Sequence, residues 1–354
     1  MASPTATPTE ASVLEALRSV QDPDLHQDIV TLGFVKDLRI CGDNVAFQIE
    51  LTTPACPVKD LMKSQAERAV KALPGVGSVA IEMTARVTAS RPILGNKGVI
   101  PGVKNVIAVS SGKGGVGKST VAVNLACALQ KTGARVGILD ADVYGPNVPL
   151  MLGVTGQPAV VDKKIVPFER HGLQVMSMAL LVADDQPVIW RGPMLHSAVR
   201  QFLFDVAWHD LDYLVVDLPP GTGDAQLSLS QQAHLMGAVI VTTPQDVSVL
   251  DVKKAIRMFQ TVNVPILGVV ENMAWFTPPG HTEKYRLFGE GGGEKIEREF
   301  GVPLLGQIPI EIAVREGGDG GKPIVVAAPE SASAKALAAI AGKVAQRISI
   351  QNAE

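Results

Sequence analysis

The stretch Gly112-Lys-Gly-Gly-Val-Gly-Lys-Ser119 decides the fold of this chain. It matches the phosphate-loop pattern GxxxxGK[ST] at every fixed position, follows the apolar run Val106–Val109 and opens the helical stretch Lys118–Thr132. Its glycines let the backbone bend with amide groups pointing inward, which forms a nest for anions at the start of a helix. The sequence therefore predicts a nucleotide-binding P-loop domain.

The residue types in this loop suit a nucleotide triphosphate. We expect Lys118 to reach the β- and γ-phosphates, Ser119 to ligate Mg²⁺, and Thr120 to hydrogen-bond the α-phosphate. Lys113 can point away from its own phosphates, so it either meets the nucleotide of a second protomer or is a solvated lysine. The other residues expected to cradle the phosphates are Gly112, Gly114, Gly115, Val116 and Gly117.

Aspartates follow two more apolar runs that we expect to form strands. Asp140 and Asp142 follow Val136–Leu139, and Asp217 ends the Walker B pattern that begins at Tyr213. Because ligands bind at the carboxyl ends of parallel strands, we predict that Asp142 orients or activates the attacking water. Asp217 and Asp140 are then predicted to hold or support Mg²⁺. A strand-end aspartate is often only a helix cap, and this alternative stays open for each of them.

Two further segments follow predicted strands. The stiff loop Pro219-Pro-Gly-Thr-Gly-Asp224 is a candidate switch that senses the γ-phosphate. Asn272 comes after the apolar run Ile266–Val270, and its carboxamide offers the donor and acceptor needed to read a purine edge. The alternative is that Asn272 is an ordinary turn residue.

Short apolar runs and helical stretches alternate through this part of the chain. The runs do not alternate apolar with polar residues, as expected for parallel strands buried on both faces. We therefore predict an α/β fold, a doubly wound and mainly parallel sheet of the P-loop NTPase kind. Besides the segments above, the predicted strands and helices are Leu214–Val216, Ala238–Val241, Ser228–Met236, Ser248–Thr261 and Ala332–Ile348.

The first part of the chain has the pattern of a small α+β unit. The predicted elements are a helix from Val13 to Val20, strands Val35–Ile40 and Val45–Leu51, a helix Val58–Ala72 and a strand Val76–Met83. We divide the chain into a disordered tail (1–11), a small domain (12–89), a linker rich in Gly and Pro (90–103) and a P-loop ATPase domain (104–354).

The composition argues against several classes of protein. Lys+Arg number 32 and Asp+Glu 35, a net charge of −3 that argues against nucleic-acid binding as the main role. We see no secretory signal and no apolar run of membrane-spanning length, so we expect a cytoplasmic protein with no membrane partner. Its cysteines Cys41, Cys56 and Cys127 are too few and too far apart for a disulfide scaffold, and indicate a reducing compartment.

With its extra Lys113, the loop resembles the deviant Walker A motif of the MinD/ParA class. Further strings narrow the resemblance to the Mrp-type iron–sulfur cluster carrier ATPases, with a small iron–sulfur assembly domain fused ahead. In the ATPase part these strings are Asp140–Asn147, Trp190–Met194, Asp217–Asp224, Glu271–Met273 and Phe288–Gly293; in the first part they are Asp22–Asp24, Asp28–Phe34 and Thr53–Pro57.

The resemblance implies a slow, switch-like ATP hydrolase that acts as a homodimer, with Lys113, Lys118 and Asp142 taking part in catalysis. It also implies that the protein binds a labile [4Fe–4S] cluster and passes it to apo iron–sulfur proteins, in contact with assembly scaffolds. The alternative is a MinD/ParA-like positioning or regulatory ATPase that binds no cluster. The end of the chain, Ile348–Glu354, is not a basic amphipathic anchor, which argues against membrane positioning.

One departure from the family pattern concerns the cluster ligands. The family usually carries a CxxC pair between the Glu-Asn-Met and Phe-Gly strings, but Pro278 and His281 stand at that spacing here. In this respect the chain resembles the cyanobacterial and chloroplast-type branch, which also lacks the pair.

Cys56 is the remaining candidate for a cluster ligand or transfer thiol. It lies just before a predicted helix, where the helix N-terminus is expected to lower the pKa of the thiol and favour the iron-binding thiolate. The alternative is a structural cysteine. Cys41 and His281 are weaker candidates for co-ligands, and Cys127 is expected to pack in the core.

Overall fold

The computed structural model describes residues 7–89, 98–142, 145–181 and 192–353, and the chain divides into two compact units. The first unit is Met1–Thr88 together with Ser349–Glu354, and the second is Ala89–Ile348. Ser349–Glu354, which we had placed with the ATPase part, therefore groups with the first unit. Positions 1–6 of the predicted tail and 90–97 of the predicted linker lie outside the described residues, so the predicted domain borders stay predictions.

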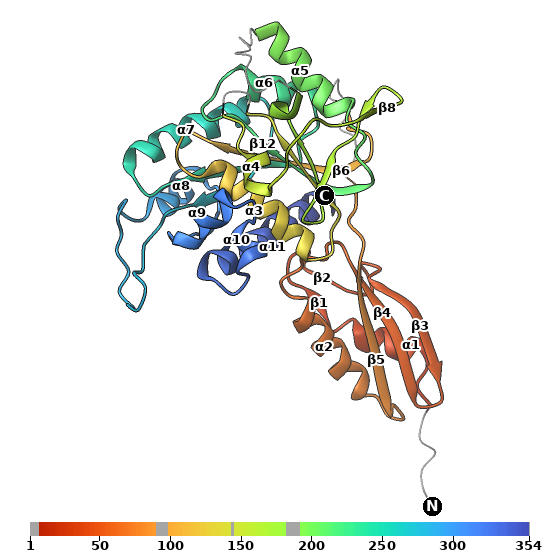
Figure 1. Ribbon diagram of the computed structural model, residues 1–354. Coiled ribbons are helices and arrows are strands. Elements are labelled where there is room, and N and C mark those ends of the chain that lie inside the picture. The colour runs from red at the N-terminus through yellow and green to blue at the C-terminus, as the bar shows by residue number, and fades with distance from the viewer. Residues whose placement is uncertain (1–6, 90–97, 143–144, 182–191, 354) are drawn as a thin grey trace, which may run out of the picture. The chain divides into compact units, whose positions relative to one another are not determined.

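The first unit is a three-stranded sheet packed against helices, drawn in red and orange in Figure 1. β3 and β4 form an antiparallel hairpin, and β5 joins β4 in parallel. Leu17 and Met62 from the two helices share a buried core with Phe47 and Ile49 of β4. The elements are α1 (Glu10–Leu17), β1 (Gln21–Asp22), β2 (Gln27–Asp28), β3 (Val35–Cys41), β4 (Asn44–Leu51), α2 (Lys59–Lys71) and β5 (Ser78–Ala85).

Helix α1 begins at Glu10, inside the predicted tail. The reason is a capping box, in which Ser12 N donates to Thr9 Oγ1 (3.2 Å) and Thr9 N donates to Ser12 Oγ (2.9 Å). These bonds satisfy backbone donors that a helix start leaves free. Helix α1 therefore includes Glu10 and Ala11, which we had placed in the tail, and Ser12 takes the place that Glu or Gln usually holds in this motif.

The second unit is built on an eight-stranded sheet, which confirms the predicted α/β doubly wound class (Figure 1). The strand order is β10-β11-β7-β12-β6-β13-β14-β15; β10 is antiparallel to β11, and the other neighbours are parallel. The strands are β6 (Val103–Ser111), β7 (Val136–Asp140), β10 (Phe168–Arg170), β11 (Leu173–Ser177), β12 (Leu211–Asp217), β13 (Gly237–Thr242), β14 (Ile266–Glu271) and β15 (Leu304–Gln307). The sequence patterns missed β10, β11 and β15.

Helices cover the sheet, with α3 packed on β12, β7 and β6, and α7 packed on β13 and β6 (Figure 1). A separate two-stranded hairpin pairs β8 (Val160–Val161) with β9 (Lys164–Ile165). The helices are α3 (Lys118–Lys131), α4 (Val148–Leu152), the 3₁₀ turn η1 (Met178–Leu181), α5 (Gly192–Phe204), α6 (Asp224–Gln232), α7 (Asp246–Thr261), α8 (Gly292–Phe300), α9 (Ile312–Asp319), α10 (Ile324–Ala327) and α11 (Ala332–Ala353). None of the helices within the described ranges is long and apolar enough to cross a membrane.

Helix α6 starts and ends earlier than the predicted helix Ser228–Met236. It stops at Gln232 because Ala233 is extended and forms a β-bridge with Gly98. That pairing partner lies more than a hundred residues away along the chain, so a local pattern does not reveal it.

Both faces of the central strands are buried. Ala108 and Val216 belong to a core cluster that also contains Val252 and Phe259 of α7. Their neighbours Ile107 and Val215 point to the opposite face and are also fully buried. This two-sided burial explains the absence of apolar–polar alternation in the sequence, and it leaves the carboxyl edge of the sheet for polar residues.

Helix α7 offers a matched test of this packing. We expect Val252→Ala, at a fully buried site, to lower the free energy of unfolding by about 2 kcal/mol through lost apolar contact and a cavity. Val247→Ala, on the same helix at a side chain 60% exposed, should change it by less than about 0.5 kcal/mol. Urea unfolding followed by tryptophan fluorescence reports on this unit, because Trp208 and Trp275 belong to it and the sequence of the first unit contains no tryptophan. Equal effects of the two substitutions would contradict the packing.

Candidate functional site

The predicted phosphate loop joins β6 to α3 at the carboxyl edge of the sheet. Gly115 and Gly117 have φ angles of 78° and 82°, the left-handed region that glycine adopts without strain. Gly112 lies against the backbone of α7, where an added Cβ would clash with Asp251 and Val252. Glycine is therefore required here both for backbone conformation and for close packing.

Lys118 is the centre of a buried charge cluster. Its side chain is 6% exposed, and its Nζ lies 2.7 Å from Asp217 Oδ1, 3.7 Å from Asp142 Oδ2 and 3.3 Å from Ser119 Oγ. The structure thus brings together residues that the sequence predicted separately from the phosphate loop and from the ends of two other strands. The carboxylates outnumber the ammonium group, which favours a bound cation.

Asp217 provides an oxygen that suits a metal ion. Its carboxylate is fully buried, and Oδ2 has no hydrogen-bond partner within the described ranges. Burial raises the pKa of Asp217 above its ordinary value, although the neighbouring Lys118 charge and the hydrogen bonds from Lys118 and Ser119 oppose this. Carboxylate and hydroxyl oxygens are the ligands that Mg²⁺ prefers. Asp217 and Ser119 therefore fit a magnesium ion.

Both carboxylate oxygens of Asp140 accept hydrogen bonds from neighbouring residues. Oδ1 accepts a hydrogen bond from Asp142 N (3.1 Å), and Oδ2 accepts from Val148 N and from Ser177 Oγ (3.2 Å each). Burial, followed by the nearby charge of Asp217, raises the pKa of Asp140 to about 8. The contact with Val148 caps the start of α4, so the helix-cap alternative describes this residue, and its role at the metal stays a prediction.

Lys113 lies on the open side of the loop. Its Nζ is 3.4 Å from Oε1 of Gln245, which precedes α7. An added Cβ at Gly114 or Gly115 would meet no atom within 4 Å, so this face of the loop is open in the single chain. The prediction that Lys113 reaches the nucleotide of a second protomer stays untested.

Glu271 is the last residue of β14, and Asn272, which follows it, contacts the phosphate loop. Asn272 is 7% exposed, and its Nδ2 donates to Val116 O at 2.9 Å. Glu271 is 1% exposed and accepts hydrogen bonds from Gly293 N (2.6 Å) and Gln307 Nε2 (2.8 Å). The sequence reasoning assigned no role to Glu271, although a carboxylate at the end of an apolar strand was an available signal. The purine-reading role of Asn272 stays a prediction.

The candidate switch loop is tied to the end of β6. Gly221 N donates to Ser111 O at 2.9 Å, and the fully buried Gln226 donates through Nε2 to Pro219 O. A loop after Asp217 therefore lies beside the phosphate loop, as a γ-phosphate sensor requires. Nothing in the sequence pointed to Gln226, because a glutamine in a helix has many ordinary roles.

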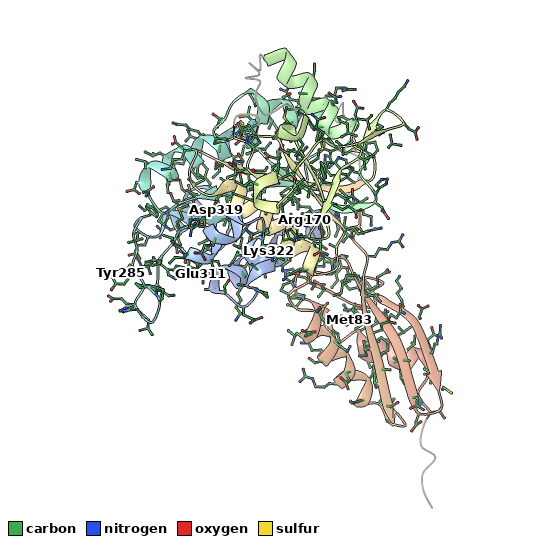
Figure 2. The ribbon with its side chains drawn as sticks, in the orientation of Figure 1. Met83, Arg170, Tyr285, Glu311, Asp319 and Lys322 are labelled. Carbon is green, nitrogen blue, oxygen red and sulfur yellow. The ribbon has the colours of Figure 1, made fainter. Side chains whose placement is uncertain are left out.

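The segment that replaces the CxxC pair forms a hairpin. Phe276 and Tyr285 exchange backbone hydrogen bonds of 2.8 Å, and Lys284 Nζ lies 4.3 Å from the ring centroid of Trp275. Figure 2 shows Tyr285 on this segment, which extends away from α8 and α9. At its tip His281 is exposed. In the described part of the chain, no group of three or more His, Cys, Asp or Glu is placed to hold a metal ion.

Cys56 does not have the lowered pKa that the sequence predicted. The thiol is half-buried, and burial raises its pKa above the ordinary value. A backbone hydrogen bond from Val58 opposes this shift, while the charges of Asp22 and Asp24 add to it. The helix starts only at Lys59, so its N-terminus does not outweigh desolvation. The role of Cys56 as a cluster ligand stays a prediction.

The other two cysteines have surroundings different from those of Cys56. Cys41 is exposed at the hairpin where β4 begins, whereas Cys56 follows the other end of that strand. Strand β4, roughly 25 Å long at about 3.3 Å per residue, separates the hairpin of Cys41 from the segment that leads to Cys56, and the role of Cys41 as a co-ligand stays a prediction. Cys127 is 1% exposed in α3, and burial raises its pKa to about 12, which confirms its place in the core.

Two family descriptions match this chain. Residues 102–345 match the NUBPL iron-transfer P-loop NTPase family, and residues 10–82 match the iron-sulfur cluster assembly protein family. The chain is 54% identical over 348 residues to a Synechocystis protein named iron-sulfur cluster carrier protein, which covers 97% of this chain and 98% of that relative.

Solved structures agree with the fold. A nucleotide-binding protein from Archaeoglobus fulgidus, in complex with ADP, is 42% identical and matches with a TM-score of 0.58 over 66% of this chain and 91% of that one. The cell division ATPase MinD from Pyrococcus furiosus is 28% identical, with a TM-score of 0.52 over 68% of this chain and 98% of that one.

The raised pKa of Cys56 predicts slow alkylation. At pH 7 we expect iodoacetamide to modify exposed Cys41 faster than Cys56, because little of the Cys56 thiol is ionised and part of it is buried. The Cys56 rate should rise steeply with pH, and Cys127 should react only on unfolding. Peptide mass spectrometry of timed reactions, with a urea-unfolded sample as the control, measures all of these rates. A Cys56 rate already at its maximum at pH 7 would contradict the raised pKa.

Proposed function

This chain belongs to the NUBPL iron-transfer P-loop NTPase family, and from this premise we propose that it is an ATP-dependent carrier of iron–sulfur clusters. The observation that carries the proposal is the buried contact of Lys118 with Asp217 beside the phosphate loop, in a chain that aligns over nearly its whole length with a protein named iron-sulfur cluster carrier protein. The same alignment favours this function over a MinD/ParA-like positioning ATPase.

The proposed reaction is hydrolysis of ATP. The backbone of the loop from Gly112 to Gly117 would bind the phosphates, and Lys118 would exchange its contact with Asp217 for the β- and γ-phosphate oxygens. Ser119 and Asp217 would hold Mg²⁺, which when bound neutralises developing charge on the phosphates. Asp142 would then orient the attacking water, since its carboxylate already lies beside Lys118.

We expect the active form to be a homodimer. The open face of the loop at Gly114 and Gly115 leaves space for a second protomer, whose nucleotide Lys113 would contact. In that arrangement ATP would hold the protomers together, and hydrolysis would release them. The cytoplasm is the expected location.

The proposed cargo is a [4Fe–4S] cluster on its way to apo iron–sulfur proteins. Such a cluster ordinarily takes four thiolates, and one Cys56 from each protomer supplies only two. Assembly scaffolds, clients or non-protein ligands would complete the set. An incomplete set of protein ligands favours release of the cluster to a client that offers all four.

Lys118→Ala tests the nucleotide site. We expect ATP affinity to fall by more than a hundredfold and hydrolysis to be lost, because the phosphates lose a buried ammonium partner. The matched control is Lys104→Ala, which removes a similar 2.8 Å contact, to Asp212, at the other end of β6. Calorimetric titration and phosphate release measure both. Hydrolysis by Lys118→Ala at the rate of the unaltered protein would contradict the assignment.

Anaerobic reconstitution with iron and sulfide tests the carrier function. We expect the unaltered protein to gain charge-transfer absorbance and bound iron, and Cys56→Ala to lose both, with Cys41→Ala as the control that retains them. Failure of the unaltered protein to bind iron would overturn the carrier proposal. Equal iron in the unaltered protein and Cys56→Ala would exclude only Cys56.

A further inference from the structure

The carboxamide of Asn272 makes a contact that base recognition does not require. Its Nδ2 donates to Val116 O at 2.9 Å, inside the phosphate loop and 156 residues away along the chain. The side chain is 7% exposed, so water does not compete freely for this bond. One donor of the carboxamide is thus already committed to the loop backbone.

This bond sets the orientation of one peptide group in the loop. The peptide between Val116 and Gly117 is planar, so its C=O and N–H point in opposite directions. Holding the carbonyl toward Asn272 turns the N–H of Gly117 to the other side, away from Asn272. Without that bond, the conformational freedom of Gly117 would allow the peptide to rotate and present a carbonyl oxygen to the phosphates.

Close packing reinforces the hydrogen bond. A Cβ added to Gly117 would clash with Asn272 Nδ2, so the carboxamide lies directly against the loop at that glycine. Gly117 is also the residue that precedes helix α3, with a left-handed φ of 82°. The loop is therefore supported at the position where the phosphate cradle turns into the helix.

Asn272 is itself held firmly. Its backbone N donates to Thr242 O at 2.8 Å, which fastens it to the end of β13. The preceding Glu271 accepts hydrogen bonds from Gly293 at the start of α8 and from Gln307 at the end of β15. Because its backbone and the preceding residue are held by three neighbouring elements, Asn272 can hold a flexible glycine loop in one conformation.

We infer that Asn272 is a positioning residue of the phosphate loop: by holding Val116 O, it keeps the Val116–Gly117 peptide in the orientation that binds phosphate. The inference rests on the proposed nucleotide-binding function. It differs from purine reading in one measurable respect, because a residue that positions the loop acts on any polyphosphate, with or without a base.

The test compares ATP with inorganic tripolyphosphate, which has no base. We expect Asn272→Ala and Asn272→Ser, whose uncharged side chains are too short to reach Val116 O, to weaken magnesium-dependent binding of both ligands by the same factor, about tenfold for the loss of one buried hydrogen bond. The ratio of the two affinities should stay unchanged, as measured by calorimetric titration of the full chain.

Asn105→Ala is the matched control. Asn105 is also buried in the sheet and donates through Nδ2 to a backbone carbonyl, Asp212 O at 3.1 Å, but at the amino end of β6. Its substitution should lower the melting temperature without changing either affinity. Melting curves of all variants separate folding effects from binding effects.

Three other outcomes would contradict the positioning role of Asn272 or the proposed nucleotide binding. If the Asn272 variants lose ATP affinity but keep tripolyphosphate affinity, Asn272 reads the base and the positioning role is excluded. Unchanged affinity for both ligands would exclude it too. If the unaltered protein binds neither ligand, the proposed nucleotide-binding function fails, and the inference fails with it.

Discussion

The buried ion pair between Lys118 and Asp217 is the contact on which the site depends. It joins the first residue of α3 to the last residue of β12, at 2.7 Å and almost out of contact with water. Burying either charge alone would cost several kcal/mol, on the order of 3–5 kcal/mol when one partner is removed. The strand order makes the pair possible, because β12 lies between β6 and β7 and places Asp217 beside Val109 and Asp140. A phosphate that took Lys118 would leave Asp217 free for a cation.

The surroundings of that pair come from strands far apart in the sequence. Asn272 supports the loop from β14, Gly221 ties the switch loop to the end of β6, and Asp140 caps α4. Each of these contacts satisfies a backbone group near the carboxyl edge of the sheet. The phosphate loop is rich in glycine, which leaves its backbone intrinsically flexible. It can still adopt one conformation, because its neighbours rather than its own side chains restrain it.

The cysteines, unlike the charged residues around Lys118, are not gathered into one site among the described residues. Lys118, Asp142 and Asp217 lie together within one chain, whereas no group of three or more His, Cys, Asp or Glu is placed to hold a metal ion among the described residues. Cys56 is half-buried, and burial raises its pKa, so its thiol is protonated in the free protein at neutral pH. If Cys56 binds iron as proposed, binding would release that proton, and cluster loading would depend on pH. A carrier with this property would hold its cargo more weakly as the pH falls.

The sequence by itself determined the phosphate loop, the mainly parallel sheet and the small α+β unit, because these depend on motifs and on apolar periodicity within about twenty residues. It also located Lys118, Ser119, Asp142 and Asp217 before their distances were known. Only the tertiary structure decided that Asn272 holds Val116, that Glu271 fastens α8 and that Asp140 caps a helix. It likewise reversed the expected pKa shift of Cys56. The physical reason is that desolvation and hydrogen-bond partners are set by segments that meet only in the folded chain.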